Sequence, residues 1–453
     1  MMTSTSYASR GEAFRTGSDS PVAALEEHLE IIAKREPGVR AFVCLDTDGA
    51  RRAAAAAEKR WRSNTPLSPI DGMVIGVKDI IETLDFPTGQ GLPALERFQS
   101  GRDAACVAAM KAAGAIVIGK TTTTEFASTE LHYPTRNPHD LSRTPGGSSS
   151  GSAAAAGSGM VQVALASQVV GSTLRPSSYN GAFGYKPTWG GLNRSGVYDY
   201  LSQSCLGIIG RHLDDMWISV RQIAMRAGGD PGHVGVLGPD LPGGVQKPRR
   251  VAILRTDGWK SASADVKAAF ERKVEALRSA GVETADAGDD PLVAALESAI
   301  AGALDKTWRV LVWEMRWPLN VYGAQPALGM SDAMRMRLAQ GEAMTQADYA
   351  AALSDRETAR ARLRDVASSY DCLLTLGAVS AAPADFATTG DPSFNVPASY
   401  LGAPALSLPL LQDGGMPLGL QVVGGHHQDA RLFAISRWLV QQASASAAAG
   451  GTP

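Results

Sequence analysis

A lysine at the end of an apolar segment and a long Gly/Ser-rich segment are the residues most suited to chemistry. Lys78 follows residues 69–77, whose Val, Ile and Gly content is typical of a buried strand. A random lysine is usually an ordinary surface residue, but burial lowers the pKa of an amine, and a neutral amine can act as a base. Residues 144–176 read TPGGSSSGSAAAAGSGMVQVALASQVVGSTLRP. These residue types allow a serine nucleophile that is served by a lysine base.

The composition of residues 144–176 is also typical of a flexible linker. The flanks argue against a linker, because residues 160–165 are apolar and predict a buried strand, and the segments on both sides look packed. Glycines that bracket serines can instead mark backbone with positive φ, or backbone that approaches a reacting group closely. We interpret the segment as a reactive loop.

Other chemistries find little support in the sequence. No histidine lies in a recognisable Ser-His-Asp motif, there is no G-x-S-x-G elbow with a later acid and histidine, and His426–His427 resembles a loop pair more than a pair of metal ligands. Residues 114–121 match the G-x-x-x-x-G-K-T pattern of a phosphate-binding loop. The four residues between its glycines are apolar and mostly β-branched, a helix precedes it, and no clear helix begins at Lys120. We therefore predict a strand there, with no metal and no cofactor.

Composition bounds the class of protein. The 453 residues carry a formal net charge of −2 with both signs interspersed, which gives no electrostatic case for nucleic acid or a membrane surface. The four cysteines are far apart, so free thiols in a reducing compartment are expected. No apolar run reaches the length of a membrane span, and the first residues lack a signal-peptide core. We expect a cytoplasmic monomer or homodimer that acts on a small molecule.

Strand and helix patterns alternate along the chain, which predicts an α/β fold with a large mixed, mostly parallel sheet surrounded by helices. We expect one domain over residues 1–453, with disorder at residues 1–20 and 443–453. Residues 290–370 have a largely helical pattern rich in Trp and Met. Such a cluster is usually core, but a helical insertion that forms a lid over the active site is the alternative.

Several motifs together resemble the amidase signature family, whose members use a Ser–cis-Ser–Lys triad. The resemblance extends from about residue 69 to residue 439 and implies the fold of that family. Its segments are IGVKD at 75–79, GKT at 119–121 with EF at 125–126, PTRNP at 134–138, the Gly/Ser loop at 144–152, GYKPT at 184–188, PALS at 404–407 and PLGLQ at 417–421.

The resemblance assigns the reacting side chains. The family's lysine corresponds to Lys78, its bridging serine to Ser148 and its nucleophile to Ser172, which follows Ser148 by 24 residues as in the family. It implies a cis peptide bond between Gly147 and Ser148. In the implied reaction, neutral Lys78 accepts a proton from Ser148, which accepts one from Ser172 as that oxygen attacks a carbonyl carbon. The oxyanion would be held by the backbone N–H groups of Val169, Val170, Gly171 and Ser172.

The sequence departs from the family before the nucleophile, where T-D-x-G-G-S is usual and residues 167–172 read SQVVGS. Gln168 at the aspartate position, with arginine three residues after the serine, is similar to a branch that acts on small amides and related C–N bonds. Val170 in place of glycine predicts a differently shaped oxyanion loop, because a β-branched residue disfavours positive φ. The substrate pocket is expected to include Gly147, Gln168, Trp313 and Trp317.

Two classes of function follow from the resemblance. The first is a free-standing hydrolase of amides, aryl amides or carbamates, which share the carbonyl–nitrogen bond. The second is the ammonia-delivering amidase component of a tRNA-dependent amidotransferase. Gln168 and the helical insertion favour the first, and a non-enzymatic scaffold is disfavoured because all three triad positions carry the required side chains.

Overall fold

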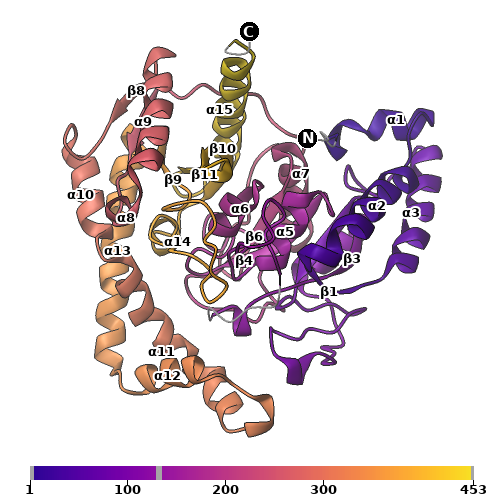
Figure 1. Cartoon of the computed structure of the whole chain (residues 1–453), viewed down its shortest axis with the longest axis horizontal. Helices are drawn as coiled ribbons and strands as arrows, with labels where there is room; N and C mark the ends of the chain where they lie inside the picture. The colour runs from indigo at the N-terminus through magenta and orange to yellow at the C-terminus, as the bar shows by residue number, and fades with distance from the viewer. Residues whose placement is uncertain (1–4, 129–134, 450–453) are drawn as a thin grey trace.

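The computed structural model describes residues 5–128 and 135–449, and its centre is one mixed sheet (Figure 1). Eleven strands lie in the order β1-β3-β2-β4-β6-β5-β10-β11-β9-β7-β8. Their bounds are β1 Phe42–Leu45, β2 Val74–Lys78, β3 Ile116–Thr121, β4 Val163–Gln168, β5 Phe183–Lys186, β6 Cys205–Gly210, β7 Arg250–Ile253, β8 Glu283–Ala285, β9 Cys372–Leu376, β10 Ala405–Asp413 and β11 Met416–Val423.

The predicted α/β class and mixed sheet are confirmed, but parallel pairs are in the minority. Only the pairs β2–β3, β2–β4, β7–β8 and β7–β9 are parallel among the described strands. The other six neighbouring pairs are antiparallel. One reason is the tight connection between β10 and β11 through Gly414 and Gly415, which both have positive φ. A connection this short can join only antiparallel strands.

Helices surround the sheet. They are α1 Gly11–Thr16, α2 Pro21–Val39, α3 Thr47–Arg62, α4 Ala105–Ala112, α5 Ser150–Ser158, α6 Leu174–Asn180, α7 Leu213–Ala227, α8 Gly258–Ser261, α9 Ala264–Ser279, α10 Pro291–Ile300, α11 Ala303–Gly323, α12 Asp332–Glu342, α13 Gln346–Ser369, α14 Val396–Tyr400 and α15 Asp429–Ala449. Within the described part of the chain, no helix is long and apolar enough to cross a membrane.

Strand β4 shows how the sheet separates two layers. Its residues Val163 and Leu165 belong to the hydrophobic cluster that contains buried residues of α4 and α7. Its residues Ala164 and Ala166 belong to the cluster that contains the four alanines of α5. Successive side chains of a strand point to opposite faces, so β4 is apolar throughout and buried on both sides.

The Gly/Ser/Ala-rich segment is buried structure, which excludes the linker interpretation. Helix α5 is buried along nearly its whole length. A Cβ added at Gly151 would come within 2.1 Å of the Ala41 carbonyl oxygen, and one at Gly157 within 2.2 Å of the Asn180 carbonyl oxygen. The small residues therefore let α5 approach neighbouring backbone closely.

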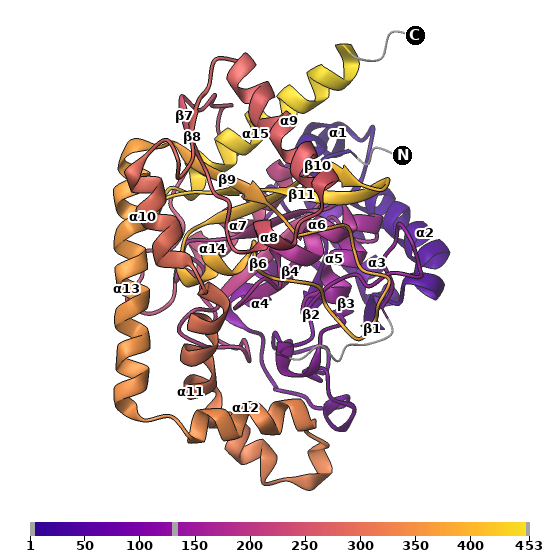
Figure 2. The same ribbon diagram turned by 60° about the vertical axis from the view of Figure 1, so that its left-hand side comes forward.

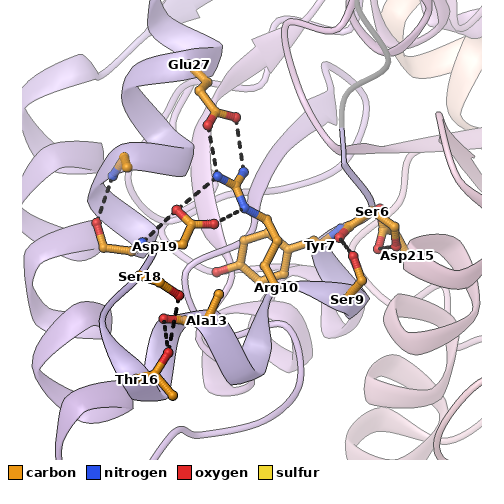
Figure 3. Close-up of polar contacts among 12 residues, drawn as sticks. Ser6, Tyr7, Ser9, Arg10, Ala13, Thr16, Ser18, Asp19, Glu27 and Asp215 are labelled. Carbon is orange, nitrogen blue, oxygen red and sulfur yellow. Dashed lines mark hydrogen bonds and ion pairs between the residues drawn. The ribbon is translucent and has the colours of Figure 1, made fainter.

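The expectation of disorder at residues 1–20 is wrong for the part that the structure describes. Arg10 bonds to the carboxylates of Asp19 and Glu27 (Figure 3). The Tyr7 backbone N–H donates to Asp215 at 3.1 Å, and Phe14 is buried. These ion pairs and the buried aromatic rings fix the segment against α2 and α7. At the other end α15 continues to residue 449, while residues 1–4 and 450–453 lie outside the described residues.

The predicted strand in residues 114–121 is present as β3, so the phosphate-loop pattern is coincidental. Lys120 is fully buried, and its ammonium donates to the carbonyl oxygens of Ile81 and Pro87 and to Thr88 Oγ1 at 2.9–3.0 Å. These contacts fix the loop that follows β2, and β2 itself ends at Lys78.

Residues 290–370 are helical and form α10 to α13. Helix α13 runs along one side of the molecule, with α11 and α12 at its lower end (Figure 2). Buried side chains of α11 and α12, including Leu311, Met315 and Met334, form a hydrophobic cluster with Val169. This part of the chain therefore packs directly against the loop that precedes Ser172.

Candidate active site

Lys78 lies at the end of β2 and is completely buried. Its Nζ is 2.8 Å from Ser148 Oγ and 2.9 Å from Ser167 Oγ. The parallel neighbours β3 and β4 flank β2, so the serine loop and the end of β4 converge on the lysine. Ser167 is not among the residues predicted from the sequence, although it lies immediately before Gln168 at the end of β4.

The environment of Lys78 favours a neutral amine. Burial lowers the pKa of Lys78 to about 7, and the nearby negative charge of Asp199 opposes that shift. No carboxylate is hydrogen-bonded to its Nζ among the described residues. A neutral amine retains a lone pair, so Lys78 can accept a proton from the Ser148 hydroxyl.

Ser148 precedes α5, and the Gly147–Ser148 peptide bond is cis, as the resemblance implies. Arg175 Nη2 donates to the Gly147 carbonyl oxygen at 2.9 Å and to Thr389 Oγ1 at 2.8 Å. A Cβ at Gly147 would come within 2.7 Å of Thr389 Cγ2. Gly147 thus lies beside the site, in a position too crowded for a side chain.

Ser172 lies in the turn between β4 and α6 and lines the same cavity as Ser148. The Ser149 N–H donates to the Ser172 carbonyl oxygen at 3.3 Å, which joins the two serine loops. The fold thereby brings all three predicted reacting residues to one place, with Lys78 behind Ser148 and Ser172 on the cavity wall.

Gln168 has a different place from the one expected. It is completely buried, and the cavity lining does not include it. Its Oε1 accepts the backbone N–H groups of Thr173 and Leu174, both at 2.9 Å, and its Nε2 donates to Ser399 Oγ at 2.9 Å. Gln168 therefore caps the start of α6 and fixes the turn that carries Ser172, because the first N–H groups of a helix lack partners within the helix.

Backbone donors are available beside Ser172. The N–H groups of Val170, Gly171 and Ser172 have no hydrogen-bond acceptor among the described residues. Val169 and Val170 line the cavity with Ser172. Buried N–H groups without partners are costly, and donors grouped beside a nucleophile suit the oxygen of a tetrahedral intermediate. The φ of Val170 is not positive, so its β-branched side chain imposes no strain on the loop.

The cavity around Ser148 and Ser172 has a volume of about 500 Å³ and a mixed wall that is more apolar than polar. Helices α11 and α12 supply Trp308 and Met336 to it. Trp313 and Trp317, which the sequence suggested for the pocket, instead border a separate surface depression, and Trp317 is 71% exposed. They lie on α11 with Trp308, but a helix turns about 100° per residue, so Trp313 and Trp317, one turn apart, share one face and Trp308 lies on another.

The lining carries cations but no carboxylate among the described residues. Arg175 and Arg337 are its charged members, and the side chain of Arg337 lies 4.2 Å from the ring centre of Trp308. No group of three metal-ligating side chains occurs in the described ranges. The expectation that the enzyme needs no metal stays a prediction.

Comparisons with known proteins identify the family. The model of the amidase family matches residues 23–433. The chain belongs to the amidase signature family. A solved amidase structure superimposes with a TM-score of 0.81 at 27% identity and covers 97% of this chain and 100% of that chain. The chain is therefore an amidase-type enzyme, a hydrolase that acts on C–N bonds.

Curated relatives of this amidase include a component of the glutamyl-tRNA(Gln) amidotransferase of two bacteria. The protein of Thermus thermophilus is 31% identical, with 92% of this chain and 93% of the relative covered. That of Roseiflexus castenholzii is also 31% identical, with 94% and 93% covered. These relatives favour the amidotransferase alternative over the free-standing hydrolase.

Proposed function

We propose that this amidase cleaves the carbonyl–nitrogen bond of a small molecule through an acyl-enzyme on Ser172. The observation that carries the proposal is the contact between buried Lys78 and Ser148, beside a cavity that Ser148 shares with Ser172. A lysine whose pKa is lowered to about 7 is a base at neutral pH. Nothing but serine, lysine and backbone groups is required for the reaction.

In the proposed reaction, Ser172 Oγ attacks the carbonyl carbon and transfers its proton to Ser148, while Ser148 passes its own proton to Lys78. The backbone N–H groups beside Ser172 stabilise the oxyanion. The C–N bond then breaks, and the proton returns through Ser148 to the leaving nitrogen. Water repeats the same transfers on the ester of Ser172, which releases the acid and restores the serine.

The apolar cavity favours a free-standing hydrolase of an amide, aryl amide or carbamate. Leu304, Trp308 and Leu311 form apolar wall suited to an aryl or alkyl group. Glutamine carries both an α-carboxylate, which Arg175 or Arg337 of the lining could bind, and an α-ammonium group, for which the described lining holds no carboxylate partner. The apolar part of the wall thus favours an amide or carbamate with an aryl or alkyl group over glutamine, while the reaction class is the same for both.

The relatives supply the second candidate. The glutamyl-tRNA(Gln) amidotransferase components are similar to this chain over more than nine-tenths of both lengths. On this proposal the chain releases ammonia from glutamine, as one component of an assembly that acts on tRNA. It would then have protein partners and a nucleic acid nearby, contrary to the expectation from net charge.

A substrate panel separates the two. The purified chain alone is assayed with aryl amides, alkyl amides, carbamates and glutamine, in EDTA and without ATP. Turnover of an apolar amide or carbamate, with glutamine slower by about a hundredfold or more in kcat/KM, supports the free-standing hydrolase. Glutamine as the preferred substrate supports the amidotransferase component. No turnover of any amide, with Ser172 unreactive toward a serine-directed phosphonate, overturns both.

A further inference from the structure

The carbonyl groups of the loop before Ser172 are all held by hydrogen bonds. Gln203 Nε2 donates to the Val169 carbonyl oxygen at 2.9 Å. Ser399 Oγ donates to the Val170 carbonyl oxygen at 2.9 Å. The Arg175 backbone N–H, in the first turn of α6, donates to the Gly171 carbonyl oxygen at 3.0 Å. Three successive peptide groups are therefore fixed through their oxygens.

Fixing these oxygens also fixes the N–H groups. A trans peptide group is planar, with its C=O and N–H on opposite sides, so a held carbonyl sets the direction of the N–H in the same plane. The Val169 carbonyl shares its plane with the Val170 N–H, and the Val170 carbonyl with the Gly171 N–H. Both of these N–H groups lack acceptors among the described residues. Gln203 and Ser399 therefore lie on the carbonyl side of these two peptide groups, and the N–H groups of Val170 and Gly171 point to the opposite side.

Gln203 and Ser399 each make a second side-chain contact. Both are buried, and Ser399 Oγ accepts from Gln168 Nε2 at 2.9 Å. Gln203 Nε2 also lies 3.2 Å from Thr307 Oγ1 on α11. A carbonyl oxygen only accepts, so the Gln203 amide must present its NH₂ to Val169. The contact with α11 connects the loop before Ser172 to the helices that line the cavity.

We propose that Gln203 and Ser399 are positioning residues for the oxyanion-binding N–H groups of Val170 and Gly171. The inference deepens the proposed function and rests on it. Neither side chain lines the cavity, so each acts through the backbone and not by contact with substrate. Preorganised donors stabilise the transition state because they need no reorientation as charge develops. Loss of the hydrogen bond from Gln203 or from Ser399 lets the peptide group that carries the Val170 or Gly171 N–H rotate. This weakens binding of the transition state more than binding of substrate.

The test compares Gln203→Met and Ser399→Ala with wild type on the best amide of the panel. Removal of an oxyanion donor costs about a hundredfold or more in kcat, and a misdirected donor costs less. We expect each variant to lose about tenfold in kcat with KM within about twofold. A trifluoromethyl ketone that matches the acyl group forms a tetrahedral adduct on Ser172. Its inhibition constant is expected to rise by the same factor as kcat falls.

Two further variants separate positioning from general destabilisation. Ser219→Ala removes a matched buried hydroxyl, which donates to the Asp215 carbonyl oxygen at 2.8 Å within α7 and does not line the cavity. It should leave kcat and the inhibition constant unchanged at a similar loss of thermal stability. Ser399→Thr keeps the hydroxyl and should restore most of the lost kcat.

The outcomes are distinct. If Gln203→Met and Ser399→Ala both fold and keep wild-type kcat and ketone affinity, or if only KM rises, the positioning role is wrong while the hydrolase function stands. If only one of the two variants folds, its kcat and inhibition constant alone test the positioning role, by the same criteria. If wild type neither turns over amides nor binds the ketone, the proposed function fails and the positioning role with it.

Discussion

Lys78 Nζ lies 2.8 Å from Ser148 Oγ, and both side chains are buried. A charged ammonium is costly in such a place, because burial removes the water that stabilises it. The same burial that lowers the stability of the charged form makes the neutral amine available as a base. The pH dependence of both activity and stability should therefore depend on this one residue.

The activity of the enzyme should fall on the acid side of neutrality. The pKa of Lys78 is about 7, so below that pH the amine is increasingly protonated and cannot accept a proton from Ser148. We expect kcat/KM to fall about tenfold per pH unit below that value and to level off above it. Lys78→Ala should remove this dependence and lower amide turnover by several orders of magnitude. Lys78→Arg should not restore it, since guanidinium stays charged. An active arginine variant would mean that another group is the base.

Protein stability should rise with pH between about 7 and 10 because of Lys78. In the unfolded chain the lysine pKa is near 10.4, whereas in the folded chain it is about 7. Between these values the unfolded state holds a proton that the native state lacks, so stability rises with pH. Below about pH 7 Lys78 is protonated in the native state as well, so the free energy of unfolding is lowered by the full cost of burying the charge. Lys78→Met should raise Tm more at pH 6 than at pH 10. Lys260→Met, at an exposed site, serves as the control. An equal gain at both pH values would contradict the lowered pKa.

Ser172 should be the nucleophile. Ser172→Ala is expected to fold normally and lose essentially all turnover, and a serine-directed phosphonate should label Ser172 in wild type. Ser177→Ala is a suitable control because Ser177 is buried, donates to the Thr173 carbonyl oxygen and lies outside the cavity lining. Peptide mapping of the labelled protein identifies the site. Label on Ser148 or Ser177, with Ser172 unmodified, would overturn the assignment.

Trp308 should influence which substrates fit. Its ring lines the cavity, whereas Trp317 is 71% exposed outside it. Trp308→Ala enlarges the cavity, so we expect the ratio of kcat/KM for bulky over small amides to rise by about tenfold. Trp317→Ala should leave that ratio unchanged. A shift with Trp317→Ala, and none with Trp308→Ala, would place the substrate elsewhere on α11.

Much of the site could be recognised in the sequence because its residues lie in short contiguous motifs. Lys78 ends an apolar strand, and the strand pattern itself predicts burial and a lowered pKa. The first serine loop and α5 are rich in small residues because backbone must approach backbone there, as Gly151 of α5 shows. The β-branched residues before Lys120 predict a strand and exclude a phosphate loop. Each of these features depends on local sequence alone.

Contacts between distant segments required the tertiary structure. Gln168 is adjacent to the reacting loop in sequence, yet its side chain turns inward to cap α6 and to contact Ser399, 231 residues away. Which of the tryptophans on α11 faces the cavity depends on how that helix packs against Val169, and its sequence pattern does not fix that rotation. Parallel or antiparallel pairing likewise depends on which strands meet across long connections. Sequence therefore indicated the candidate reacting side chains, while packing determined what holds them and what lines the cavity.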